Sequence, residues 1–165
     1  MGLSSVGSSI ANCYATANVK ADHSYGRAGG IVGNLDAGCS VKYCYATGSV
    51  EGRDISGISG YGAGTTDNSV ALNTSITATT LANRVCNSAV TGTKNYARSN
   101  MPGTWTDKDP DKQNGADVSP GIATTEYNNQ TWWTTAGNWS GGAWDFTTIW
   151  EMSNGNNTGS LPLFK

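Results

Sequence analysis

The chain has 165 residues, of which 22 are glycine and only 13% are charged, and its formal net charge is -2. Long amphipathic helices need charged outer faces, so this composition favours a turn-rich, all-β protein. Because 10 basic residues face 12 acidic ones, no positive surplus exists for phosphates, and we expect no nucleic-acid partner. No apolar stretch reaches the roughly 18 residues of a membrane helix, so we expect no membrane span in this chain.

A segment near the N-terminus recurs almost letter for letter: residues 10–19 reappear as residues 41–50. In each copy, small or apolar residues alternate with polar or aromatic ones, which predicts one continuous strand per copy. A worn third copy and the start of a fourth follow. The equivalent anchor residues, which are 31, 25 and 26 positions apart, are Tyr14, Tyr45, Val70 and Tyr96.

The repeat predicts a solenoid-like stack of about three coils over residues 1–101, because one such unit cannot bury its inner face alone. A β-sandwich is the alternative fold. Residues 2–5 resemble the tail of an earlier repeat, so we expect the chain to start mid-repeat, with any export signal or anchor lost. We also expect Gly29, Gly30 and Gly57 to occupy corners that require positive φ.

Stacked coils bring equivalent side chains next to one another. On the outer face we therefore expect Tyr14, Tyr45 and, beyond the worn third unit, Tyr96 to form an aromatic column. Structural stacking is the favoured interpretation of this column, and a ligand-binding strip is the alternative.

The pairing of Asn-Cys-Tyr-Ala-Thr at residues 12–16 with Gly-Gly-Ile-Val-Gly at residues 29–33 resembles the GLUG-motif repeat family, over about residues 2–101. That family occurs in bacterial surface proteins, adhesins and secreted IgA-peptidase-like proteins. The resemblance implies a non-catalytic, adhesin-like module, secreted or at the cell surface, that contacts a host or neighbouring-cell protein or glycan. A spacer region of a secreted IgA-peptidase-like protein is an alternative. The family supplies no active-site residues.

The composition changes after Met101, where a polar loop dense in turn formers begins, and we expect the boundary between two regions there. Residues 102–165 hold all six tryptophans, five of them after residue 130. The open end of a repeat stack exposes strand edges and core residues, which an atypical terminal segment usually covers. We therefore expect this region to be a tryptophan-rich β cap. Large residues alternate over 144–150, which predicts a cap strand.

Four aromatic residues of this region are candidate ligand contacts. Exposed rings would form a platform for sugars, and a carbohydrate-binding module is therefore an alternative function; buried rings would fill the cap, which we favour. The four residues are Tyr127, Trp132, Trp133 and Trp139.

Three carboxylates, Asp107, Asp109 and Asp111, alternate as they do in a calcium loop. Lys112 and Val118 stand where that loop needs glycine and glutamate, so we expect a solvated acidic loop, with a calcium site as the weak alternative.

The four cysteines contain no Cys-x-x-Cys pair, and the chain has one histidine, so we expect no zinc and no other cofactor. Cys13 and Cys44 occupy matching positions of adjacent units, where a disulfide is possible, but buried thiols are favoured. His23 lies between Asp22 and Ser24 without the spacing of a catalytic triad. We expect no enzyme.

Overall fold

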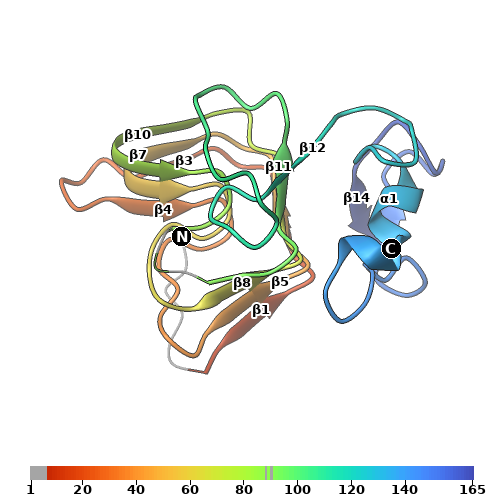
Figure 1. Ribbon diagram of the computed structural model, residues 1–165, viewed down its shortest axis with the longest axis horizontal. Coiled ribbons are helices and arrows are strands. Elements are labelled where there is room, and N and C mark those ends of the chain that lie inside the picture. The colour runs from red at the N-terminus through yellow and green to blue at the C-terminus, as the bar shows by residue number, and fades with distance from the viewer. Residues whose placement is uncertain (1–6, 88, 90) are drawn as a thin grey trace. The chain divides into compact units, whose positions relative to one another are not determined.

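The computed structural model describes residues 7–87, 89 and 91–165 and divides the chain into two compact units, Met1–Asp117 and Val118–Lys165 (Figure 1). Strands dominate the described residues, and the protein is all-β. No helix in these ranges is long and apolar enough to cross a bilayer. The expected repeat tail at residues 2–5 lies outside the described residues.

The first unit consists of three sheets, and each sheet takes strands from successive repeats, paired in parallel (Figure 1). The first sheet contains β1 (Ser9–Ala11), β5 (Ser40–Lys42) and β8 (Thr65–Asp67). The second contains β2 (Tyr14–Ala15), β6 (Tyr45–Ala46), β9 (Val70–Ala71), β11 (Tyr96–Arg98) and, at its end, β12 (Ala116–Val118). The third contains β3 (Val19–Lys20), β4 (Arg27–Gly29), β7 (Val50–Ser56) and β10 (Ile76–Asn83).

The register of the second sheet follows the predicted repeat. Tyr14 pairs with Tyr45, Tyr45 with Val70, and Val70 with Tyr96. The rings of Tyr14 and Tyr45 stack with centroids 5.4 Å apart and planes 9° apart. Val70 separates Tyr45 from Tyr96, so the stacked part of the expected column contains two rings.

The prediction of one continuous strand per repeat is wrong. Residues 10–19 are divided among β1, β2 and β3, because the chain turns sharply after β1. The residue at this corner has a left-handed backbone in every repeat, with φ between 51° and 54°. The alternation of residue types in the sequence therefore continues through a corner at which the chain changes direction. The equivalent corner residues are Asn12, Tyr43, Asn68 and Lys94.

The residue after each corner supplies a side-chain acceptor to the preceding repeat. The backbone N–H of Cys44 donates to Ser69 Oγ at 3.3 Å, and that of Ser69 donates to Asn95 Oδ1 at 3.0 Å. The sulfur of Cys44 in turn interacts with the backbone of Cys13. Asn95 is fully buried and also donates through Nδ2 to the Thr66 carbonyl. Thiol, hydroxyl and amide thus perform one task in successive repeats, satisfying a buried N–H group.

The glycines at residues 29, 30 and 57 are needed for a reason other than the expected one. None of the three has a positive φ. Instead, a Cβ atom at Gly30 would collide with the carbonyl oxygen of Gly57, and one at Gly57 with that of Arg84. These glycines allow the backbones of adjacent repeats to approach each other closely.

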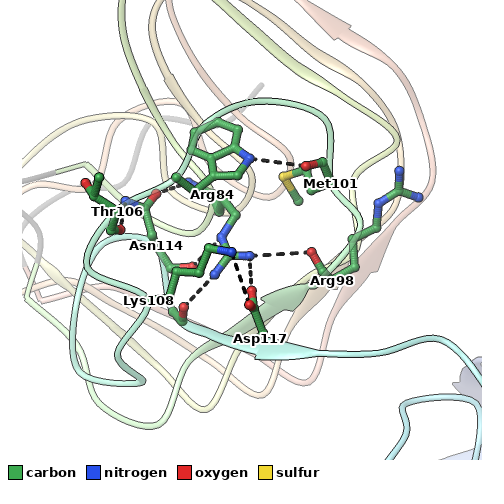
Figure 2. Close-up of polar contacts among 9 residues, drawn as sticks. Arg84, Arg98, Met101, Thr106, Lys108, Asn114 and Asp117 are labelled. Carbon is green, nitrogen blue, oxygen red and sulfur yellow. Dashed lines mark hydrogen bonds and ion pairs between the residues drawn. The ribbon is translucent and has the colours of Figure 1, made fainter.

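Arg84 stands at the position of Gly30 and Gly57 in the third repeat, since the N–H of Gly57 donates to its carbonyl oxygen. Its side chain is completely buried and extends into the final turn of the unit (Figure 2). Nε donates to the Asn114 carbonyl at 2.9 Å, Nη2 to the Gly115 carbonyl at 2.7 Å, and Nη1 pairs with Asp117. This buried guanidinium joins residues 114–117 to the repeat that precedes them.

These contacts explain where the first unit ends. Residues 110–117 accept hydrogen bonds from the last full repeat; for example, the N–H of Asn95 donates to the Pro110 carbonyl at 2.8 Å. The division therefore follows Asp117, whereas the change of composition pointed to Met101.

The second unit is built around its tryptophans. It contains the short helices α1 (Gln130–Thr134) and η1 (Ala136–Asn138) and an antiparallel pair, β13 (Trp150–Met152) and β14 (Pro162–Phe164). Trp133 and Trp150 are fully buried, and Trp144 contacts both, with ring centroids 4.5 and 5.0 Å away. The unit thus has an aromatic core of its own.

The predicted cap strand over residues 144–150 is wrong except at its last residue. Asp145 Oδ1 accepts the N–H groups of Thr147 and Thr148 at 2.7 and 2.9 Å. These bonds close a turn, because an aspartate side chain competes with sheet hydrogen bonds. The role of the region as an end cap stays a prediction.

We predict that Asn95→Ala lowers the free energy of unfolding of the first unit by about 2 to 4 kcal/mol, because it leaves the N–H of Ser69 and the carbonyl of Thr66 buried without these partners. Asn100→Ala, at an exposed turn, serves as the control and should change it by less than about 0.5 kcal/mol. Urea titration followed by far-UV circular dichroism measures both. Equal effects of the two variants would contradict the role assigned to Asn95.

A second prediction concerns Asp117. Partial burial raises the pKa of this carboxyl, but hydrogen bonds from Arg84 and Lys108 outweigh burial, and the pKa lies below its usual value. The stabilisation is therefore complete above about pH 4, the usual value, and is lost as pH falls through the lowered pKa. Melting temperatures between neutral pH and pH 2 should fall more steeply for the native protein than for Asp117→Asn. An Asp107→Asn control should retain the steep native profile.

Candidate functional site

The four aromatic residues predicted as ligand contacts lie together in the second unit, and all are buried. Their exposed fractions are 8% for Tyr127, 3% for Trp132, 0% for Trp133 and 4% for Trp139. Trp132 meets Trp133 and Trp139 edge to face, at 4.8 and 5.0 Å. The Trp133 indole donates to the Tyr127 carbonyl at 2.7 Å. This arrangement is that of a packed core, in which the rings stabilise the unit.

A hollow of about 330 Å³ lies beside Trp132. Four threonines and Asn138 line it together with Trp132, and its lining is more apolar than polar; the threonines are Thr124, Thr125, Thr131 and Thr135. The amide of Asn138 donates to the Trp132 carbonyl at 2.8 Å, which fixes its orientation. The hollow offers neutral polar groups and little aromatic surface.

In the acidic loop, the carboxylates of Asp109 and Asp111 accept hydrogen bonds from backbone N–H groups. Asp109 Oδ1 accepts the N–H of Asp111 at 2.8 Å, and Asp111 Oδ1 accepts the N–H of Lys94 at 3.0 Å. In the described part of the chain, no group of three or more His, Cys, Asp or Glu side chains is placed to hold a metal ion.

The four cysteines are free thiols. Cys13 Sγ donates to the Ala11 carbonyl and Cys44 Sγ to the Lys42 carbonyl, both at 3.2 Å, so the matched thiols make matched hydrogen bonds. Burial raises the pKa of Cys44 to about 12 and that of Cys86 to about 12, which keeps both as unreactive thiols.

The most exposed large hydrophobic side chain in the described residues lies on an insertion between β3 and β4. In the third sheet, Val19 pairs with Val50 and Arg27 with Asp54. Val19 and Arg27 are eight positions apart in the first repeat. Their partners Val50 and Asp54 are only four positions apart in the second, so the first repeat carries four extra residues here. Insertions within a repeat form loops that often carry the binding function. Tyr25, on this loop, is 73% exposed.

Neighbouring side chains fix the position of Tyr25. The guanidinium of Arg53 lies 5.4 Å from the ring centroid, and the imidazole ring of His23 lies 5.9 Å from it. Arg53 is itself held, because Nη1 donates to the Ser24 carbonyl at 3.1 Å and Nε to Thr80 Oγ1 at 3.3 Å. The N–H of Tyr25 donates to His23 Nδ1 at 3.2 Å. The ring is thus presented by an ordered turn.

A hollow of about 250 Å³ adjoins this turn, lined by residues 21–24, by residues 51–53 of β7 and by Thr79. Charges of both signs surround it: Lys20 Nζ lies 3.2 Å from Asp22 and 3.4 Å from Glu51. The hydrogen bonds that Lys20 donates to these carboxylates, that to Asp22 foremost, raise the pKa of Lys20 above its usual value. The hollow is therefore polar and carries charges of both signs, from Asp22 and Glu51 and from Arg53.

We define the Tyr25 surface as His23, Tyr25 and Arg53 with the adjoining hollow. An exposed aromatic ring with a fixed guanidinium and an imidazole beside it is suited to binding the apolar face and hydroxyl groups of a sugar, or a side chain of a protein partner. Sequence reasoning placed a polar turn here but did not select Tyr25. The available signal was the length of the turn relative to the matched segment of the second repeat.

Comparison with known proteins supports the repeat assignment over part of the chain. Residues 24–51 match the family model described as the GLUG motif. No curated protein and no solved structure matches the chain. The matched segment begins in the turn that carries Tyr25 and continues through β4, β5 and β6 into β7. The chain therefore contains a GLUG motif at residues 24–51, and the predicted resemblance to the GLUG-motif family is confirmed there.

Proposed function

We propose that this protein is a non-catalytic, adhesin-like recognition module, secreted or held at a cell surface, that contacts a host or neighbouring-cell protein or glycan through the Tyr25 surface. The observation that carries the proposal is the 73% exposure of Tyr25 on an insertion of the repeat. An exposed ring held in place by its neighbours loses little conformational entropy when a ligand binds.

The architecture that we propose for the first unit is a β-solenoid. Its support is the shared register of the three sheets: Ser9, Tyr14 and Val19 pair in turn with Ser40, Tyr45 and Val50 of the next repeat. Such a stack is a rigid support, because each repeat is hydrogen-bonded to its neighbour in all three sheets. Function then resides in the segments that depart from the repeat.

A second candidate function is carbohydrate binding by the second unit. The hollow beside Trp132 favours it, since its threonine hydroxyls and the Asn138 amide match the neutral hydroxyl groups of a sugar. This site would hold a ligand inside a hollow, whereas the ring of Tyr25 would stack against the ligand.

We predict that Tyr25→Ala weakens binding to the ligand found on a glycan or host-protein array about 10- to 100-fold, because exposed aromatic anchors contribute about 1.4 to 3 kcal/mol. Its melting temperature should stay unchanged, as the side chain is largely exposed. Ile122→Ala removes another exposed apolar side chain, 64% exposed, and should bind as the native protein does. If Thr135→Ala loses binding and Tyr25→Ala does not, the second candidate replaces the first. The absence of any bound glycan or protein would overturn both.

A further inference from the structure

The turn that presents Tyr25 is closed by two hydrogen bonds to the same residue, His23. The N–H of Gly26 donates to the His23 carbonyl at 2.7 Å, as in an ordinary β-turn. The N–H of Tyr25 donates to His23 Nδ1 at 3.2 Å. This second bond resembles that of an Asx turn, in which a side-chain acceptor bonds the N–H two residues further on. Of the two bonds, only this one depends on a group that titrates near neutral pH.

The bond to Tyr25 determines the protonation state of His23. Nδ1 can accept an N–H group only while it carries no proton, so the imidazole is neutral and its proton lies on Nε2. His23 is exposed to solvent. An ordinary imidazole takes up a second proton within the range of about pH 5 to 8. Nδ1 then becomes a donor, and the N–H of Tyr25 loses this acceptor.

The charged groups around His23 favour a change in the position of its ring once it is protonated. His23 lines the same hollow as Asp22, its neighbour in the chain, and Glu51 of β7. Both carboxylates attract an imidazolium ion, and both are also paired with Lys20 of β3. Arg53 of β7 lines the hollow as well and repels an imidazolium ion. Protonation therefore draws the ring toward the carboxylates and away from the guanidinium.

The other contacts of the turn do not depend on this proton. The Gly26 carbonyl accepts the N–H groups of Arg53 and Asp54 at 3.1 and 3.2 Å. Arg53 Nη1 donates to the Ser24 carbonyl at 3.1 Å, and Arg53 Nε lies 3.8 Å from Asp54 Oδ2. The guanidinium keeps its charge at every pH at which the protein is folded. Loss of the bond to Nδ1 therefore frees Tyr25 while the turn stays attached to β7.

We infer that His23 is a pH-sensitive switch, which fixes the ring of Tyr25 while it is neutral and releases the ring when it is protonated. The consequence for binding rests on the proposed function of the Tyr25 surface. A surface whose competent form is only partly populated binds with an affinity reduced by that fraction, so binding weakens as pH falls. Because the chain has one histidine, no other imidazole contributes to this effect.

Nuclear magnetic resonance of the full chain, titrated from pH 7.5 to pH 5 without any ligand, tests the switch. The amide proton of Tyr25 should move upfield with the midpoint of the His23 ring protons, because it loses a hydrogen bond. Overhauser contacts between the two rings, whose centroids lie 5.9 Å apart, should weaken in parallel. His23→Asn keeps an acceptor that does not titrate, so its Tyr25 amide should stay constant. A native Tyr25 amide that is unchanged while His23 titrates would overturn the inference.

Affinity for the ligand found on the array, measured at the same two pH values, tests the consequence for binding. The native protein should bind about 3- to 10-fold more weakly at pH 5, the usual effect of one hydrogen bond. His23→Asn should bind equally at both values, and His23→Ala should bind weakly at both. Thermal melts establish that each variant is folded. The same pH dependence in the native protein and in His23→Asn would overturn the inference. If no ligand binds, the proposed function fails, and the resonance titration alone decides on the switch.

Discussion

Each turn of the chain between the first and second sheets buries a backbone N–H group, and the rest of the first unit depends on how that group is bonded. The left-handed corner at Asn12, Tyr43, Asn68 and Lys94 directs the next N–H toward the neighbouring repeat. A side chain one repeat further along accepts it, as Ser69 and Asn95 do. Leaving such a group unbonded costs about 1 to 3 kcal/mol, so the position tolerates only side chains that can accept a hydrogen bond. Adjacent repeats are thereby held at a fixed register.

That constraint explains how much of the fold follows from the sequence. The register could be predicted, because the spacing of Tyr14, Tyr45, Val70 and Tyr96 is also the spacing of paired residues. The corners could not be predicted, since the left-handed backbone at Asn12 leaves the alternation of small and large residues in the sequence undisturbed. The end of the unit could not either: Arg84 bonds to residues 114–117 across 30 positions, and composition reports nothing about such contacts.

The burial of Tyr127, Trp132, Trp133 and Trp139 agrees with the favoured interpretation of these rings, whereas Tyr25 was not selected from the sequence, for a similar reason. Tryptophans draw attention as binding residues, but an aromatic cluster in a small unit is often its core, as Trp133 and Trp150 are. Tyr25 is a single ring in a polar turn and has no period to reveal it. Tyr25 is a candidate because of its exposure and the fixed guanidinium of Arg53, and both require the folded neighbours of the turn. The length of the insertion is the one feature of the sequence that indicates the Tyr25 surface.

The turn that carries Tyr25 is bounded on both sides by residues already paired with the next repeat, Val19 with Val50 and Arg27 with Asp54. Its ends are therefore fixed by contacts in which the turn takes no part. Natural variation in the length or composition of this segment can therefore occur while the pairing of the first repeat with the second stays the same. Under the proposed function, homologues that bind different partners should diverge first between these two pairs, with small effects on stability.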